Sequence, residues 1–129
     1  MTTPGERMRA LRFGRETLSD LTDRTDVPAG IRTAAAGVLQ RHPTHDDLVA
    51  LAETESLVLP SAWAEALKDA RTLLEEVGRL RSLPTGVPSS ILATLRHFPE
   101  AWLIDLVSRG PVLMPWLAHE RVIDHRARS

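Results

Sequence analysis

Two stretches of the chain, ALRFGRETLSDLTDRTDVPAGIRTAAAGVLQRHPTHDDLVALA at 10–52 and ALKDARTLLEEVGRLRSLPTGVPSSILATLRHFPEAWLIDLVS at 66–108, align without a gap at an offset of 56 residues. Apolar side chains and helix-breaking residues recur together at this offset. The matched pairs include Leu11 and Leu67, Arg15 and Arg71, Pro28 and Pro84, Gly30 and Gly86, and Pro43 and Pro99. Such recurrence indicates a repeat architecture. We therefore expect two tandem repeats, at 1–56 and 57–110.

Each repeat has the pattern of three helices. In the first repeat, Thr3 is a good N-cap for a helix that starts at Pro4 and runs to residue 24. A second helix follows Pro28 and ends just before Pro43, because the residue before a proline disfavours the helical conformation. Thr44 is then the N-cap of a short third helix.

The second repeat follows the same plan with later starts. Its long helix begins near Pro60 or Ser61, and its middle helix is expected from Thr85 to Phe98. Pro99 is predicted to open the third helix, and Gly110 to end it. The apolar stripe of this third helix is formed by Trp102, Leu103, Leu106 and Val107.

The remaining residues, 111–129, suggest a C-terminal capping helix. It is expected to begin near Pro115 and to carry Trp116, Val122 and Ile123, since terminal repeats need a modified end. No segment shows the alternation that is typical of a strand. The predicted fold class is therefore all-α: two tandem three-helix repeats and a capping helix, packed as one compact helical domain over 1–129.

Composition excludes several classes of protein. The 129 residues include 16 basic and 17 acidic side chains, with a formal net charge of −1 and no cysteine. Zero cysteine excludes a disulfide framework, an iron–sulfur cluster and a thiolate zinc site. A near-neutral charge argues against a general binder of polyanions. The opening has no apolar leader, and the longest apolar stretch, 111–118, is too short to span a bilayer. We expect a soluble cytoplasmic protein without membrane contact.

The opening MTTPGER at 1–7 and the segment LRHFP at 95–99 resemble the BPSL-type family of short bacterial proteins. Members begin M-T-T-P-x-E-R and carry a later helix ending L-R-H-[YF]-P. The resemblance covers residues 1–52 and, more weakly, 66–100. It implies a helical fold and a bacterial origin. It implies no activity, because none is attached to the family.

The large apolar side chains of the second half permit two interpretations. Tryptophan and methionine are typical anchors of protein interfaces. These side chains could form an exposed patch for a protein partner, or they could fill the core between the two repeats and the cap. The residues concerned are Trp63, Trp102, Val112, Leu113, Met114 and Trp116.

Four arginines of the first helix are the candidate nucleic-acid patch: Arg7, Arg9, Arg12 and Arg15. A DNA-binding regulator would need them on one surface. Acidic residues are interleaved with them, as expected of a solvated face with mixed charge. Nucleic acid is therefore the less favoured partner.

A metal site would need the cluster His42, His45, Asp46 and Asp47 to converge. The second repeat has no such cluster, so the repeat design does not require it, and no metal is predicted. His119 and His125 are six residues apart, whereas two zinc ligands on one helix face must be four apart.

The sequence favours a non-catalytic, protein-binding module of a bacterial cytoplasmic protein, such as an inhibitor or immunity-type partner. It contains no phosphate-binding glycine loop or nucleophile elbow. We therefore expect no catalytic residues and no cofactor. The alternatives are a DNA-binding regulator and, less favoured, a metal-dependent enzyme.

Overall fold

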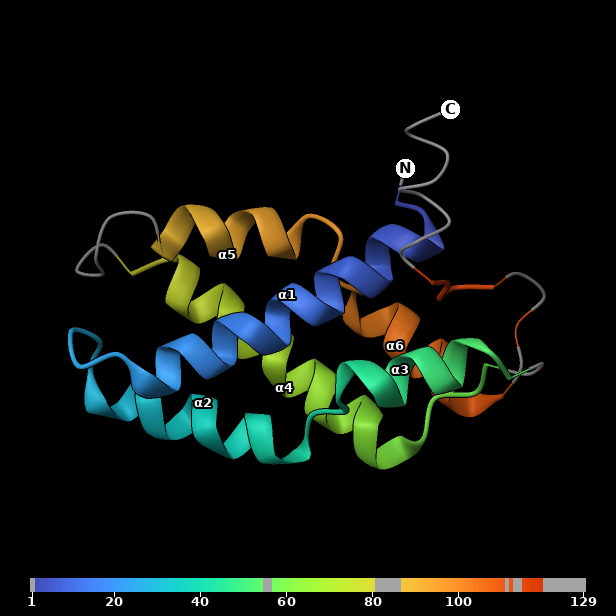
Figure 1. Ribbon diagram of the computed structural model, residues 1–129, viewed down its shortest axis with the longest axis horizontal. Helices are drawn as coiled ribbons and strands as arrows, with labels where there is room; N and C mark the ends of the chain where they lie inside the picture. The colour runs from blue at the N-terminus through green and yellow to red at the C-terminus, as the bar shows by residue number, and fades with distance from the viewer. Residues whose placement is uncertain (1, 55–56, 81–86, 111, 113–114, 120–129) are drawn as a thin grey trace.

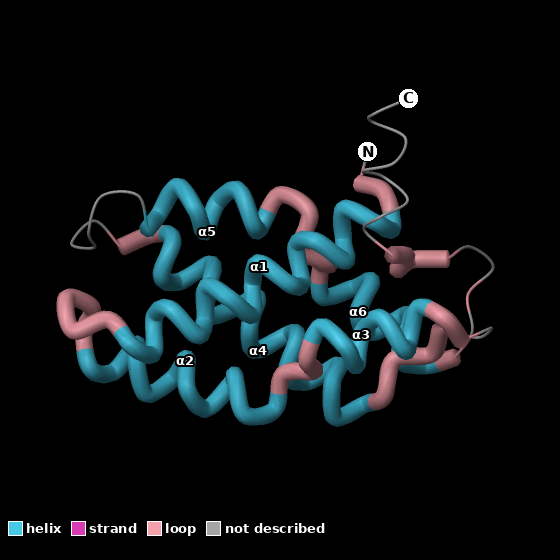
Figure 2. Tube along the Cα trace, viewed as in Figure 1, coloured by secondary structure: helices cyan, strands magenta, loops and turns pink. Residues whose placement is uncertain are grey.

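The computed structural model describes residues 2–54, 57–80, 87–110, 112 and 115–119. Their regular structure consists of helices α1 (Pro4–Asp23), α2 (Ala29–Arg41), α3 (His45–Ala52), α4 (Ser61–Gly78), α5 (Val87–Leu95) and α6 (Ala101–Arg109) (Figure 1). No strand occurs among these residues (Figure 2). The all-α prediction is confirmed.

Local capping sets the start of two helices in the first half. The Thr3 hydroxyl accepts the Glu6 backbone N–H at 3.2 Å, and the Glu6 carboxylate accepts the Thr3 backbone N–H at 2.8 Å. The same reciprocal pair joins Thr44 and Asp47 at the start of α3. Each pair satisfies two backbone donors that a helix start leaves free. The predicted starts after Thr3 and Thr44 are confirmed.

The helix bounds of the second half differ from the prediction. α5 ends at Leu95, because the Thr94 carbonyl accepts the backbone N–H groups of both His97 and Phe98 in a tight turn. This turn directs the Phe98 side chain into the core. Pro99 does not open α6, which begins at Ala101 after the N-cap residue Glu100. The predicted start at Thr85 lies outside the described residues.

The prediction of a capping helix is wrong for the residues that are described. Pro115–His119 are not helical. Tertiary contacts hold this segment instead: Ala118 N–H donates to the Pro4 carbonyl at 3.3 Å, and Arg7 donates to the Trp116 carbonyl at 3.2 Å. Residues 120–129, including Val122 and Ile123, lie outside the described part.

The long helices α1 and α4 organise the packing. α1 packs against α2 and α5, and α4 likewise packs against α5 and α2. In Figure 1, α1 crosses the front of the molecule between α5 and α2, with α4 behind it. The buried apolar side chains of all six helices form a single cluster. The largest fully buried side chains of this cluster, which also includes residues between and after the helices, are Met8, Leu11, Leu18, Leu21, Leu48, Leu59, Leu67, Leu74, Ile91, Ile104 and Leu117.

A glycine permits the close approach of α1 to the turn after α5. A Cβ atom on Gly14 would lie 2.8 Å from Cε2 of Phe98, which is closer than two carbon atoms can pack. A larger side chain at position 14 would therefore push the Phe98 ring out of its site.

Two arginines on the long helices α1 and α4 donate hydrogen bonds to backbone carbonyls near the C-terminal ends of α2 and α5. Arg15 on α1 donates to the carbonyls of Leu39 and His42, at 3.3 and 2.9 Å. Arg71 on α4 donates to the carbonyls of Phe98 and Pro99, at 2.9 and 3.4 Å. Each guanidinium thereby satisfies carbonyl groups that a chain reversal leaves without a backbone donor.

Candidate functional site

The outer face of α6 presents apolar side chains to solvent. Trp102 is 63% exposed, and Leu106, one turn later, is 47% exposed. Arg109 continues the same face at the end of the helix. The opposite face of α6 is buried through Leu103, Ile104 and Val107. We call Trp102, Leu106 and Arg109 the α6 face.

Polar contacts hold the α6 face in place. The indole N–H of Trp102 donates to the carboxylate of Glu100. Lys68 on α4 forms an ion pair with Asp105 on α6, with 2.9 Å between Nζ and Oδ1. The hydrogen bond to Asp105 raises the pKa of Lys68 above its ordinary value. These contacts orient α6 and the Trp102 side chain.

The structure separates the six residues of the predicted apolar patch. Trp102 is exposed, whereas Trp63 and Val112 are partly buried against the core. Trp116 is only 2% exposed, and its indole N–H donates to the Leu57 carbonyl at 2.9 Å. Its assignment to an exposed patch is wrong, because it fills the core. Leu113 and Met114 lie outside the described residues.

The exposure of Leu106 was missed by the sequence interpretation. That interpretation grouped Leu106 with Leu103 and Val107 in one apolar stripe. The available signal was the helical period: residues 102, 106 and 109 share one face, and 103, 104 and 107 share the other. The second set is the more uniformly aliphatic one, and it is buried.

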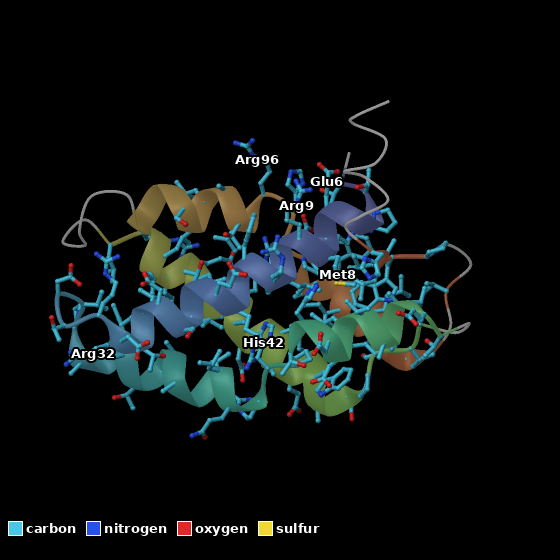
Figure 3. All side chains as sticks on the ribbon, viewed as in Figure 1. Glu6, Met8, Arg9, Arg32, His42 and Arg96 are labelled. Carbon is cyan, nitrogen blue, oxygen red and sulfur yellow. The ribbon has the colours of Figure 1, made fainter. Side chains whose placement is uncertain are left out.

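A groove of about 610 Å³ runs between α1 and α5. Phe13, which is 40% exposed, lies near its middle, with Glu16 and Thr17 beside it. Charged side chains flank it at both ends, and Figure 3 labels Glu6 and Arg9 at one of them. The lining residues of α1 are Glu6, Arg9, Ala10, Phe13, Glu16, Thr17, Asp20 and Leu21, followed by Arg24; Ser90, Ala93 and Thr94 of α5 and His97 complete the lining.

One end of the groove is tied together by His97. Its Nδ1 atom hydrogen-bonds with the Thr2 hydroxyl at 3.1 Å, and Nε2 lies 3.5 Å from the Glu6 carboxylate. Glu6 also accepts the Thr3 backbone N–H, and this bond lowers its pKa. The contacts join the start of α1 to the turn after α5. They connect residues 95 positions apart, so the sequence offered no local signal for them.

The four arginines of the candidate nucleic-acid patch do not form one cationic surface. Arg7 donates to the Trp116 carbonyl, and its burial lowers its pKa. Arg15 donates to the carbonyls of Leu39, in the last turn of α2, and of His42, just after it. Arg12 pairs with Glu16 at 3.0 Å and lies over the Phe13 ring. Arg9 lines the α1–α5 groove. Arg7 and Arg15 thus donate to backbone carbonyls. The predicted grouping of the four arginines in one nucleic-acid patch is corrected accordingly.

His42 in the candidate metal cluster is a core residue. It is 4% exposed, and Nδ1 donates to the Pro43 carbonyl at 2.8 Å. Burial lowers its pKa to about 4. Asp47 is occupied by the capping pair with Thr44. Within the described ranges, no group of three or more histidine or acidic residues is arranged to hold a metal ion.

Comparison with known proteins adds no relative. No protein-family model matches the chain, and no curated protein or solved structure is significantly similar to it. The resemblance to the BPSL-type family therefore stays a prediction. Among the described residues, none of the helices has the length and apolar character needed to cross a membrane.

Proposed function

We propose that this protein is a non-catalytic, protein-binding module whose α6 face is the binding surface. The exposed Trp102 carries the proposal. Tryptophan and arginine are the residue types most often found to dominate binding energy at protein interfaces. A tryptophan at 63% exposure leaves a large apolar area in water, which a partner would cover.

The composition of the α6 face supports a protein as the partner. Trp102 and Leu106 form an apolar centre, and Arg109 supplies a charge at its edge. An apolar centre with a polar rim is the usual anatomy of such interfaces. An inhibitor or immunity-type role in the bacterial cytoplasm fits a small module that acts by occupying a surface. This role is an analogy with proteins of similar size.

The substitution Trp102→Asp tests the α6 face. The full chain is immobilised and exposed to extract of its own source cells, and the affinity of any stoichiometric partner is then measured by calorimetry. We expect at least about thirtyfold weaker binding for the variant, since interface hot spots contribute about 2 kcal/mol or more.

Leu92→Asp is the matched control, because Leu92 is 60% exposed but lies on α5. It should retain the partner. Equal loss of the partner in both variants would contradict the assignment to α6. Recovery of nucleic acid, or turnover of a substrate by the pure protein, would contradict the proposed function itself.

We further propose that the six helices are two copies of one three-helix unit, packed as a single domain. The starts of α3 at His45 and of α6 at Ala101 are 56 residues apart, which is the period of the sequence repeat. Exchange of the two units maps α1 onto α4 and α2 onto α5. The packing of α1 on α5 then corresponds to the packing of α4 on α2. This supports two units that face each other about an approximate two-fold axis.

Arg15→Met and Arg71→Met test this correspondence. Each variant leaves two carbonyl groups without their charged donor, so each should lose about 1–3 kcal/mol of the free energy of unfolding. Urea denaturation measures the loss. Arg41→Met is the control, because it removes an exposed ion pair with Asp69 and should cost less than about 1 kcal/mol. A loss in only one of the two arginine variants would argue against equivalent roles.

A further inference from the structure

The α1 side of the α1–α5 groove carries a row of charges of both signs. Glu6, Arg9, Asp20 and Arg24 line the groove at helical spacing, with Phe13 among them. Arg12 and Glu16 form an ion pair beside Phe13. Glu6, Arg9, Phe13, Asp20 and Arg24 lie along one stripe of α1, whereas Arg12 lies at its edge and lines a separate hollow beside α3. The stripe is long enough to contact another helix over its whole length.

The α5 side of the groove is uncharged. The sequence of α5, VPSSILATL, carries no charged residue. Leu92 is nevertheless 60% exposed, and Ala93, which lines the groove, is exposed as well. Depletion of charge and exposed aliphatic side chains are features of the centre of an interface. The groove therefore has an uncharged α5 wall, formed by Ser90, Ala93 and Thr94, opposite a charged α1 wall.

The corresponding seam of the proposed repeat lies between α2 and α4. An ion pair between Arg41 and Asp69, at 3.0 Å, bridges α2 and α4. At the 56-residue offset of the proposed repeat, His97 is equivalent to Arg41 and Phe13 is equivalent to Asp69. A phenyl ring cannot form an ion pair, and His97 contacts Glu6 and Thr2 instead. Phe13 of the first repeat therefore stands where the second repeat has Asp69, so an exposed aromatic ring takes the place of the ion-paired carboxylate.

The charge row of α1 is complementary to itself when it is read in reverse. An antiparallel copy of α1, related by a two-fold axis near Gly14, would set Glu6 against Arg24 and Arg9 against Asp20. The same operation would set Arg12 against Glu16. All three contacts join opposite charges, and symmetry produces each of them twice.

We propose that the occupant of the α1–α5 groove is α1 of a second copy of this chain. The two copies form an isologous dimer, with Phe13 of each copy inserted between α1 and α5 of the other. The stripe from Glu6 to Arg24 is about 27 Å long at 1.5 Å per residue. Two neighbouring helices are about 18 Å wide. The dimer would bury about 1,000 Å² in total, at the lower limit for specific association.

An interface of this size predicts a weak dimer, with a Kd of about 10–100 µM. Sedimentation equilibrium of the full chain between about 5 and 500 µM protein measures this Kd, because that range spans mostly monomer to mostly dimer. Arg9→Glu and Asp20→Arg should each weaken the dimer about tenfold or more, because each turns two attractive contacts into repulsive ones. The double variant Arg9→Glu, Asp20→Arg restores opposite charges and should recover the dimer.

Neither substitution should disturb folding. Asp20→Arg places a positive charge in the last turn of α1, where the helix dipole favours it, and removes an exposed ion pair with Arg24 that contributes less than about 1 kcal/mol. Thermal unfolding of the variants checks this point. Trp102→Asp lies on the α6 face and should leave the dimer unchanged, so the dimer and the proposed function can fail separately.

Three results would overturn the dimer proposal. One is a chain that stays monomeric at about 500 µM, well above the expected Kd. Another is a dimer that keeps its affinity in both single-charge variants. The third is a double variant no better than either single one. A groove that instead binds a fluorescent amphipathic peptide, in a chain that stays monomeric, would assign the surface to a different partner.

Discussion

Replacing Trp116 by alanine is expected to lower the free energy of unfolding by about 3–5 kcal/mol, among the largest effects of any single substitution in this chain. The Trp116 side chain is 2% exposed within the core cluster. Its removal leaves a cavity that neighbouring helices can fill only in part. It also leaves the Leu57 carbonyl without the indole donor.

The hydrogen bond from the Trp116 indole to the Leu57 carbonyl contributes to stability because Leu57 has a left-handed backbone conformation, with φ of 50°. This conformation costs a non-glycine residue about 1–2 kcal/mol. Two bonds stabilise it: the Trp116 indole donates to its carbonyl, and its backbone N–H donates to the Thr54 hydroxyl. Trp116→Phe keeps most of the volume and removes one bond, so it should lose about 1–3 kcal/mol.

Urea denaturation of the two Trp116 variants measures both losses. Trp102→Ala is the control, because that side chain is exposed and its loss should change stability by no more than about 0.5 kcal/mol. A Trp116→Ala protein as stable as the Trp102→Ala protein would contradict the buried position of Trp116.

Acidification is expected to destabilise the protein through His42 by about 3 kcal/mol in total. Nδ1 donates to the Pro43 carbonyl, so a second proton must go to Nε2. That atom is buried and has no hydrogen-bond partner among the described residues. Burial, together with the nearby positive charge of Arg15, lowers the pKa from 6.5 to about 4.

The direction of this effect follows from proton binding in the two states. The unfolded chain takes up the His42 proton near pH 6.5, whereas the folded chain takes it up only near pH 4. The stability that depends on neutral His42 is fully present above pH 6.5, decreases as the pH falls toward 4, and is lost below pH 4. Urea denaturation at pH 7.5, 6, 5 and 4 would record the decrease.

His42→Phe is the matched variant, since Phe98 holds the equivalent position in the proposed second repeat. It should lose the part of the pH dependence that lies between 6.5 and 4, while carboxylates continue to titrate. An unchanged pH profile in His42→Phe would exclude His42 as the source.

Helix starts in the first half were predictable because their signals are local. Thr3 and Glu6 are three residues apart, as are Thr44 and Asp47. Prolines act on the preceding residue alone. In the second half, the same rules misplaced the end of α5 and the start of α6, because burial of Phe98 overrode them.

The candidate surfaces were predictable only in part. Trp102 was named from its residue type, yet the sequence grouped it with Trp116, which is buried. Arg9 was named for nucleic acid, and it lines a groove that depends on the position of α5. No pattern within one helix indicates which neighbour will cover its outer face.

Local pattern was therefore sufficient for the helical class and for the helix starts in the first half, since these depend on hydrogen bonds and steric effects within about four residues. Tertiary structure alone decided which tryptophan is core, which arginines satisfy carbonyl groups and why Pro115–His119 are not helical. Trp116 and Leu57 are 59 residues apart, and Arg7 and Trp116 are 109 apart. Such contacts form only when separate helices pack together, so burial and hydrogen-bond partners follow from the three-dimensional arrangement.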